Sequence, residues 1–170
     1  TNENAADSTF TVSLSQASGK DISFDYATSD GTATAGNDYT ATSGSLIISA
    51  GQTSGTFNIP ILSDLLDENN ETVNITLSNA TNSSFLDDSA ILTITDDDDP
   101  PTISIADVIT TNENAADSTF TVSLSQASGK DISFNYATSD GTATAGNDYT
   151  STSGSLIISA GQTSGTFNIP

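Results

Sequence analysis

The amino-acid sequence predicts an all-β protein made of tandem antiparallel β-sandwiches, on the basis of three observations. Residues 1–60 recur almost unchanged as residues 111–170, with Asn135 in place of Asp25 and Ser151 in place of Ala41. Apolar residues alternate with Ser and Thr in short runs, which is typical of half-buried antiparallel strands. Clusters of Gly, Asn and Asp separate these runs, and such residues supply the backbone conformations that turns need.

Each alternating run is predicted to be one strand. The runs before residue 100 are Phe10–Leu14, Ile22–Tyr26, Leu46–Ile48, Phe57–Ile61, Val73–Leu77 and Ala90–Ile94. A further strand, Ile103–Val108, opens the second copy, and no helical period is present. About seven short strands per repeat of 110 residues predict an Ig-like, seven-stranded antiparallel β-sandwich.

The junction between the repeats is acidic and stiff. The run Asp96–Asp99 is followed by two prolines, which favour an extended chain. We therefore place one domain at residues 1–99, lacking its first strand. The next is placed at 100–170, running from its first to its fifth strand and lacking its last two. Because an unpaired sheet edge is unfavourable, we expect the missing strands to come from more of the same array.

Composition excludes several functional classes. The chain has 22 Asp and Glu against two Lys, a net charge of −20, and ten of the acids lie in residues 61–100. Such a chain repels nucleic acid and anionic lipid and attracts cations. It contains no Cys and no His, and we find no nucleophile–base pair, so we predict that it is not an enzyme. No apolar run reaches membrane-spanning length, so no membrane insertion of this segment is expected.

Three motifs carry a family resemblance. They are Tyr26–Thr40 (YATSDGTATAGNDYT), Asp64–Ser78 (DLLDENNETVNITLS) and Leu92–Asp98 (LTITDDD). In this order and at these separations they resemble the signature of Calx-β domains, and the resemblance covers the whole repeat. It implies a seven-stranded Ig-like sandwich. It also implies Ca²⁺ ions bound at one end of that sandwich, as in the regulatory region of the sodium–calcium exchanger.

The resemblance further implies which residues bind the metal. Family ligands come from an early Glu, a Gly-x-Asp-Tyr turn, the acidic loop after the fifth strand and the terminal Asp run. The matching residues are Glu3, Asp38, Asp64, Glu68, Glu71, Asp96, Asp97 and Asp98, with Glu113 and Asp148 in the second copy. Ser63 stands where the full pattern has another Asp, which implies one ion fewer or a lower affinity.

The residues by themselves agree with a Ca²⁺ site. This ion takes six to eight oxygen ligands in flexible geometry, and carboxylates supply them without His or Cys. Strands that alternate in direction bring the loop at 62–71 and the segment after residue 95 to the same end of a sandwich. The alternative left open is that these acids form only a solvated surface.

Other polar features have structural interpretations. Asp30 and Asp140 lie in Ser-Asp-Gly turns and are predicted to form those turns. The two lysines, Lys20 and Lys130, lie in Gly-Lys-Asp segments that are predicted to be exposed turns. Tyr39 and Tyr149 are predicted to pack in the core or at its corner.

These observations predict a structural segment of an extracellular or cell-surface repeat fibre, stalk or adhesin filament, in which Ca²⁺ at the domain ends stiffens the array. Its expected partners are neighbouring copies of the same repeat, in cis or by strand exchange, and not nucleic acid. One alternative is a Ca²⁺-sensing regulatory module, as in sodium–calcium exchangers. Another is a filament of separate subunits that complete one another's sandwiches by inserting a strand.

Overall fold

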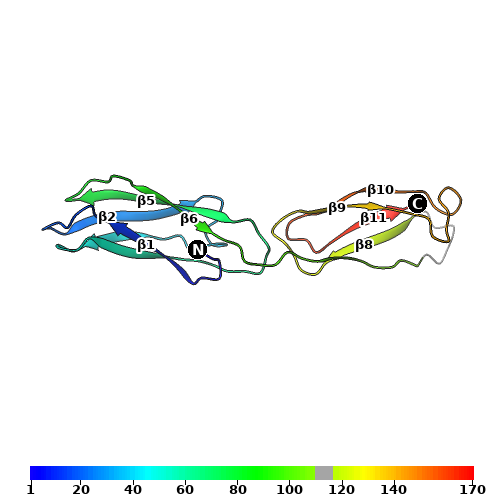
Figure 1. The fold of residues 1–170 in the computed structure, drawn as a ribbon, viewed down its shortest axis with the longest axis horizontal. Coiled ribbons are helices and arrows are strands. Elements are labelled where there is room, and N and C mark those ends of the chain that lie inside the picture. Colours follow the sequence, from blue (N-terminus) through cyan, green and yellow to red (C-terminus); the bar gives the residue numbers. More distant parts are fainter. Residues whose placement is uncertain (110–116) are drawn as a thin grey trace. The chain divides into compact units, whose positions relative to one another are not determined.

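The structure, a computed structural model, describes residues 1–109 and 117–170. Within these ranges every regular element is a β-strand and no helix could cross a membrane. The chain divides into two compact units, residues 1–65 with 69–97 and residues 66–68 with 98–170. Figure 1 shows the strands of both units, whose relative placement is not determined. The predicted all-β class with tandem repeats is confirmed.

The first unit consists of two antiparallel sheets. One pairs β1 (Asp7–Ser13) with β4 (Ser54–Pro60). The other has the order β3-β2-β5-β6 and contains β3 (Ser43–Ile48), β2 (Ile22–Asp30), β5 (Glu71–Thr81) and β6 (Ser89–Ile94). Each of these strands overlaps a run predicted from alternation.

The apolar side of the alternation fills the core of the first unit. Ile59 and Val73 have no exposed surface, and the outward Ser and Thr positions between the apolar residues face solvent. Phe57 stacks between Phe10, with ring centroids 5.7 Å apart, and Tyr26, at 4.0 Å. The core residues form one large cluster, namely Ala33, Tyr39, Phe57, Ile59, Ile61, Val73, Ile75, Leu92 and Ile94. Ile22, Phe24 and Ile48 form a second cluster.

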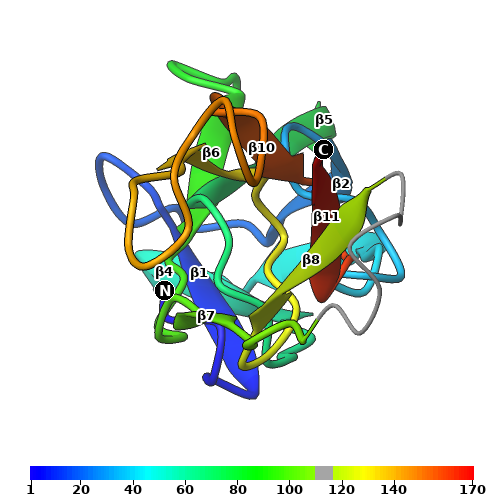
Figure 2. The same cartoon turned by 90° about the vertical axis from the view of Figure 1, so that its right-hand side faces the viewer.

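The second unit contains β7 (Ile103–Ile105), β8 (Ser118–Leu124), β9 (Ile132–Ala137), β10 (Ser153–Ile158) and β11 (Ser164–Ile169). The strands β8, β9, β10 and β11 of the second unit correspond to β1, β2, β3 and β4 of the first unit. The sheets of the second unit have the orders β11-β8-β7 and β10-β9, and Figure 2 shows β8 and β11 side by side. The aromatic stack recurs: Phe167 lies 5.5 Å from Phe120 and 4.0 Å from Tyr136.

The opening strand of the second repeat is shorter than the predicted Ile103–Val108. Its ladder stops at Ile105, which pairs with Val122. Ala106 and Asp107 follow, and both are residue types with low strand propensity. Their weak preference for the pleated conformation accounts for the early end.

One of the two positions that differ between the copies has a testable consequence. Asp25 accepts hydrogen bonds from the Ser45 hydroxyl and, at 2.8 Å, from the Asn79 amide. These bonds, the one from Ser45 foremost, lower the pKa of Asp25 below its ordinary value. A carboxyl group whose pKa is lower in the folded state than in the unfolded state stabilises the fold at a pH above its unfolded-state pKa. That stability is lost as the pH falls through the folded-state value.

We therefore expect Asp25→Asn to flatten the acid dependence of the first unit below about pH 4, near the ordinary pKa of Asp. The measurement is the urea concentration at the midpoint of unfolding, at pH 6 and at pH 3. The NMR signals of residues 71–95 monitor the unfolding of the first unit. The reverse change, Asn135→Asp, is the control. Ser155 donates to Asn135 at 2.6 Å, and no Asn79 counterpart lies in residues 98–170, so the added acid dependence should be smaller. Equal pH profiles for Asp25→Asn and the natural chain would contradict the assignment.

Candidate metal centre

A tight loop after β2 positions one group of predicted ligands. Tyr39 is buried, and its hydroxyl donates to Asp30 Oδ1 at 2.7 Å. The same oxygen accepts the Ala35 N–H at 3.0 Å. Burial, followed by the nearby Asp30 carboxylate, raises the pKa of Tyr39. Asp30 thus organises the loop, as its turn motif predicted, and the predicted packing role of Tyr39 is confirmed.

The second copy builds the same loop. Asp140 Oδ1 accepts the Ala145 N–H at 2.9 Å and the Tyr149 hydroxyl at 2.8 Å. These two bonds, in that order of importance, lower the pKa of Asp140. The hydrogen bond to Asp140 is the main reason why the pKa of Tyr149 is raised. The loop is therefore encoded by the repeated sequence itself.

Asp38 is held at the end of this loop and faces a second carboxylate. Its Oδ2 accepts the Thr34 N–H at 2.7 Å. The Asp38 side chain is half-buried. Glu71, the first residue of β5, is also half-buried, and a carboxylate oxygen of each lies within 4.8 Å of the other. Asp148 makes the same bond to Thr144, at 2.8 Å, but is exposed.

Glu3 and Asp96 form another close pair. Glu3 is only 8% exposed, and its N–H donates to the Thr95 carbonyl at 3.1 Å. The Asp96 N–H donates to Asn70 Oδ1 at 3.1 Å. Carboxylate oxygens of Glu3 and Asp96 lie within 4.8 Å of each other. Asp96 Oδ1 is buried and has no hydrogen-bond partner among the described residues.

The remaining predicted ligands are placed as follows. Asp64 is exposed, and its N–H donates to Glu3 Oε1 at 3.4 Å. Asp97 is exposed and accepts the Asn4 amide at 2.7 Å. Glu68 and Asp98 are half-buried and group with the second unit. Glu113 lies outside the described residues. The ligand assignment as a whole stays a prediction.

Two residues near these acids were not identified from the sequence. Asn70 orients the Asp96 backbone, and Asn4 orients the Asp97 side chain. Both are amides in an Asn-rich chain, and no spacing distinguishes them from their neighbours. Only the folded chain shows that they contact the terminal Asp run.

The prediction that Lys130 lies in an exposed turn is wrong. In the second unit its Nζ lies 2.6 Å from Asp67 Oδ1, and its side chain is only one-third exposed. Asp67 is buried, and the Ser128 hydroxyl lies within hydrogen-bonding distance of its Oδ2 at 3.2 Å. A buried carboxylate requires such partners. The matching Lys20 is exposed, so the turn alone does not determine the exposure of its lysine.

The donor set fits a hard divalent cation. Carboxylates a few ångströms apart repel one another unless a proton or a cation neutralises them. The paired groups offer oxygen only, which suits Ca²⁺ better than metals that prefer nitrogen or sulfur. The buried Asp96 Oδ1, which has no hydrogen-bond partner in the described part of the chain, is an atom that such a cation would satisfy.

Fold and site together define a class: tandem β-sandwich modules with acidic residues gathered after the β2 loop and around the terminal Asp run. The profile of the Calx-beta domain matches residues 1–99 and again residues 96–170. The chain belongs to the Calx-beta domain family. No curated protein matches it.

Solved structures agree on the fold. The calcium binding domain CBD12 of CALX1.1 superposes with a TM-score of 0.56 at 23% identity, over 99% of this chain and 70% of that one. CBD12 from CALX1.2 gives 0.56 at 24% identity, over 99% and 71%. The apo-form Calx CBD1 domain gives 0.53 at 30% identity, over 57% of this chain and 88% of that one.

Proposed function

We propose that the chain is a structural segment of an extracellular repeat fibre, stalk or filament, in which Ca²⁺ bound at the sandwich ends stiffens the array. The role is binding and mechanical rather than catalytic. Near-identical copies support a function that needs length, because each further repeat lengthens the chain without introducing a different kind of binding site. The similar solved structures are calcium-binding domains, which supports the choice of ion.

The observation that carries the proposal is the pair Glu3 and Asp96. A nearly buried carboxylate faces another whose Oδ1 is buried and without a hydrogen-bond partner among the described residues. Two negative charges this close repel each other, and a cation bound between them would turn that repulsion into attraction. The proposed ligands of the first repeat are those that the family resemblance implied, and the other close pair, Asp38 and Glu71, belongs to the same set.

The test is a calorimetric Ca²⁺ titration of the natural chain and of Asp96→Asn. We expect a dissociation constant of about 10⁻⁴ to 10⁻³ M, the range of extracellular modules, weakened at least roughly tenfold by the substitution. Asp88→Asn, at an exposed acid outside the proposed ligands, is the matched control and should bind like the natural chain. Equal affinity for Asp96→Asn and the control would overturn the site.

Stiffening is tested separately by small-angle scattering in Ca²⁺ and in EDTA. Neutralised carboxylates should narrow the distribution of distances within the chain, and Asp96→Asn should resemble the chelated sample. A distribution that is the same in Ca²⁺ and EDTA would rule out stiffening and leave Ca²⁺ binding itself in place. In that case the alternative of a Ca²⁺-sensing module would become the better assignment, since it needs Ca²⁺ binding without stiffening.

A further inference from the structure

Three residues of the acidic loop at 62–71 belong to the second unit, namely residues 66–68. Asp67 forms a parallel bridge with Ser128. Its carbonyl accepts the Gly129 N–H at 3.1 Å and the Ser128 hydroxyl at 3.1 Å. The segment 66–68 is therefore bound through its backbone to the turn Ser128–Lys130, which we call the anchoring turn.

The anchoring turn also holds the Asp67 side chain, which is buried. Lys130 Nζ lies 2.6 Å from Asp67 Oδ1, and the Ser128 hydroxyl lies 3.2 Å from Asp67 Oδ2. The same hydroxyl accepts the Lys130 N–H at 3.0 Å, which fixes the shape of the turn. A buried carboxylate needs an opposite charge and hydrogen bonds to remain ionised. Lys130 supplies that charge, so the anchoring of this segment requires no metal ion.

Glu68, the predicted ligand that follows Asp67, lies against Gly129. A methyl group at Gly129 would collide with Glu68 Oε1 and would lie 2.8 Å from Glu68 Cδ. Only glycine at this position leaves room for the Glu68 side chain as it lies. The anchoring turn therefore determines where a predicted Ca²⁺ ligand is placed.

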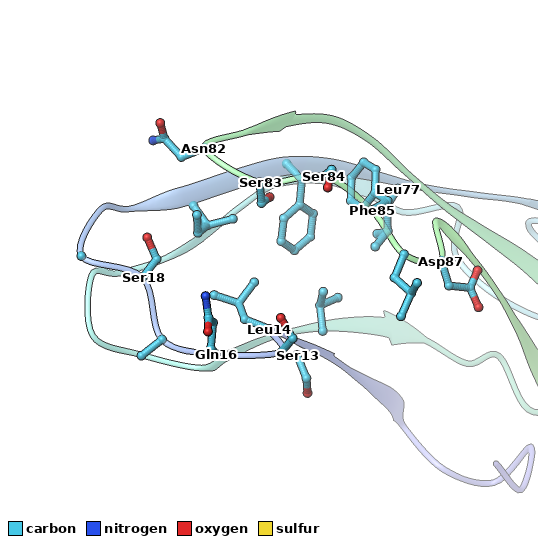
Figure 3. Close-up of a pocket in the computed structure, with 17 residues that line it drawn as sticks. Ser13, Leu14, Gln16, Ser18, Leu77, Asn82, Ser83, Ser84, Phe85 and Asp87 are labelled. Atoms are coloured by element: carbon cyan, nitrogen blue, oxygen red, sulfur yellow. The ribbon is translucent and has the colours of Figure 1, made fainter.

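The first copy contains the same turn in different surroundings. Its Lys20 N–H donates to the Ser18 hydroxyl at 3.0 Å, as in the second copy. Figure 3 shows Ser18 beside an open groove, and Val12, Ser18 and Gly19 are among the residues that line it. Lys20 is exposed, and no atom of the described residues lies within 4 Å of a methyl group at Gly19. The turn at 18–20 is therefore a matched control for substitutions in the anchoring turn.

We propose that Gly129 and Lys130 are positioning residues for Ca²⁺ binding. Lys130 fixes Asp67, Gly129 admits the Glu68 side chain, and together they hold this carboxylate in place before the ion binds. An ordered ligand loses less conformational entropy on binding than a mobile one. A turn of one repeat thus raises the metal affinity of a loop in the repeat before it. The inference rests on the proposed function for the identity of the ion, whereas the anchoring itself does not involve the ion.

The anchoring is tested in EDTA by amide hydrogen exchange of the whole chain. The Gly129 N–H donates to the Asp67 carbonyl, so its exchange rate reports release of the segment. The Gly161 N–H donates to the Ser128 carbonyl at 2.8 Å and serves as the reference within the same unit. Relative to this reference, Lys130→Met should speed exchange at Gly129 at least roughly tenfold, because the buried Asp67 carboxylate loses its positive partner. An unchanged ratio of the two rates would overturn the anchoring.

The placement of the ligand is tested by Gly129→Ala, which changes no charge. The atoms that the methyl group meets belong to a flexible side chain, so Glu68 can turn aside while the fold is kept. We expect the calorimetric dissociation constant for Ca²⁺ to rise at least roughly tenfold, as for other outer-shell substitutions. Gly19→Ala makes the same change in the matching turn and should bind within about twofold of the natural chain. The exchange rate of the Gly161 amide should be the same in both variants, which shows that the second unit is intact.

The two proposals fail in different ways. If the natural chain binds Ca²⁺ and Gly129→Ala binds it as tightly as Gly19→Ala, the positioning role is overturned and the proposed function stands. If the natural chain binds no Ca²⁺, the proposed function is overturned together with the metal-positioning role. The exchange experiment in EDTA then still decides whether Lys130 anchors the segment 66–68.

Discussion

Replacing Ile59 with Ala should destabilise the first unit by about 2–5 kcal/mol, the usual cost of emptying a buried isoleucine site. Ile59 has no exposed surface and lies in the large core cluster, which β4, β5 and β6 all enter. Deleting three carbons there leaves a cavity that Val73 and Leu92 cannot fill without moving their strands. The effect depends on packing alone, since Ile59 has no polar side-chain group.

The repeat supplies the control for this substitution. Ile169 is the same residue in the same sequence, but it is partly exposed. We expect Ile169→Ala to cost the second unit less than about 2 kcal/mol, because less apolar area leaves water there on folding. Hydrogen exchange of peptides from residues 71–95 reports the first unit, and peptides spanning Asn135 and Ser151 report the second. Equal costs at the two positions would contradict the role assigned to β5 and β6.

Gly31→Ala should also destabilise the first unit, by about 1–3 kcal/mol, as overpacked sites do. A methyl group at Gly31 would collide with the Thr72 carbonyl oxygen and would lie 2.6 Å from the Thr72 Oγ1. The same carbonyl accepts the Ala33 N–H at 3.0 Å. The loop cannot retreat from the clash without breaking this bond, which anchors it to the start of β5.

Gly141 is the matched position in the second copy, and no atom of the residues that the structure describes lies within 4 Å of a methyl group there. Gly141→Ala should leave the second unit unchanged or stabilise it by up to about 1 kcal/mol, by restricting the unfolded chain. The same exchange measurement distinguishes the two variants. If Gly31→Ala were as harmless as Gly141→Ala, the close approach of the loop to β5 would be wrong.

Strand positions were predictable because they are encoded locally. Alternation places one residue in two on the core face, and turn residues interrupt it, so the six strands of the first unit overlap the predicted runs. The register was not predictable. Ser13 pairs with Ser54 and Tyr26 with Leu77 through contacts between residues far apart in the sequence, and no local pattern selects those partners.

The candidate site divides in the same way. The Asp30 and Tyr39 loop follows from a short motif, and it recurs with Asp140 and Tyr149 because the motif recurs. The approach of Glu3 to Asp96 joins the beginning of the repeat to its end. Lys130 shows the limit most clearly, since an identical turn leaves Lys20 exposed.

Residues 7–60 and 117–170 fold into corresponding strands, loops and aromatic stacks, although β9 (Ile132–Ala137) is shorter than β2 (Ile22–Asp30), so their common sequence is sufficient for that much. Burial is different. Ile59 is enclosed while Ile169 is not, and Val12 borders an open groove while Val122 is covered by a neighbouring strand. Strand formation responds to nearest neighbours along the chain, whereas exposure depends on which distant segments pack against a residue. Identical segments therefore share their local structure and differ in burial only where a distant strand packs against one of them and not the other.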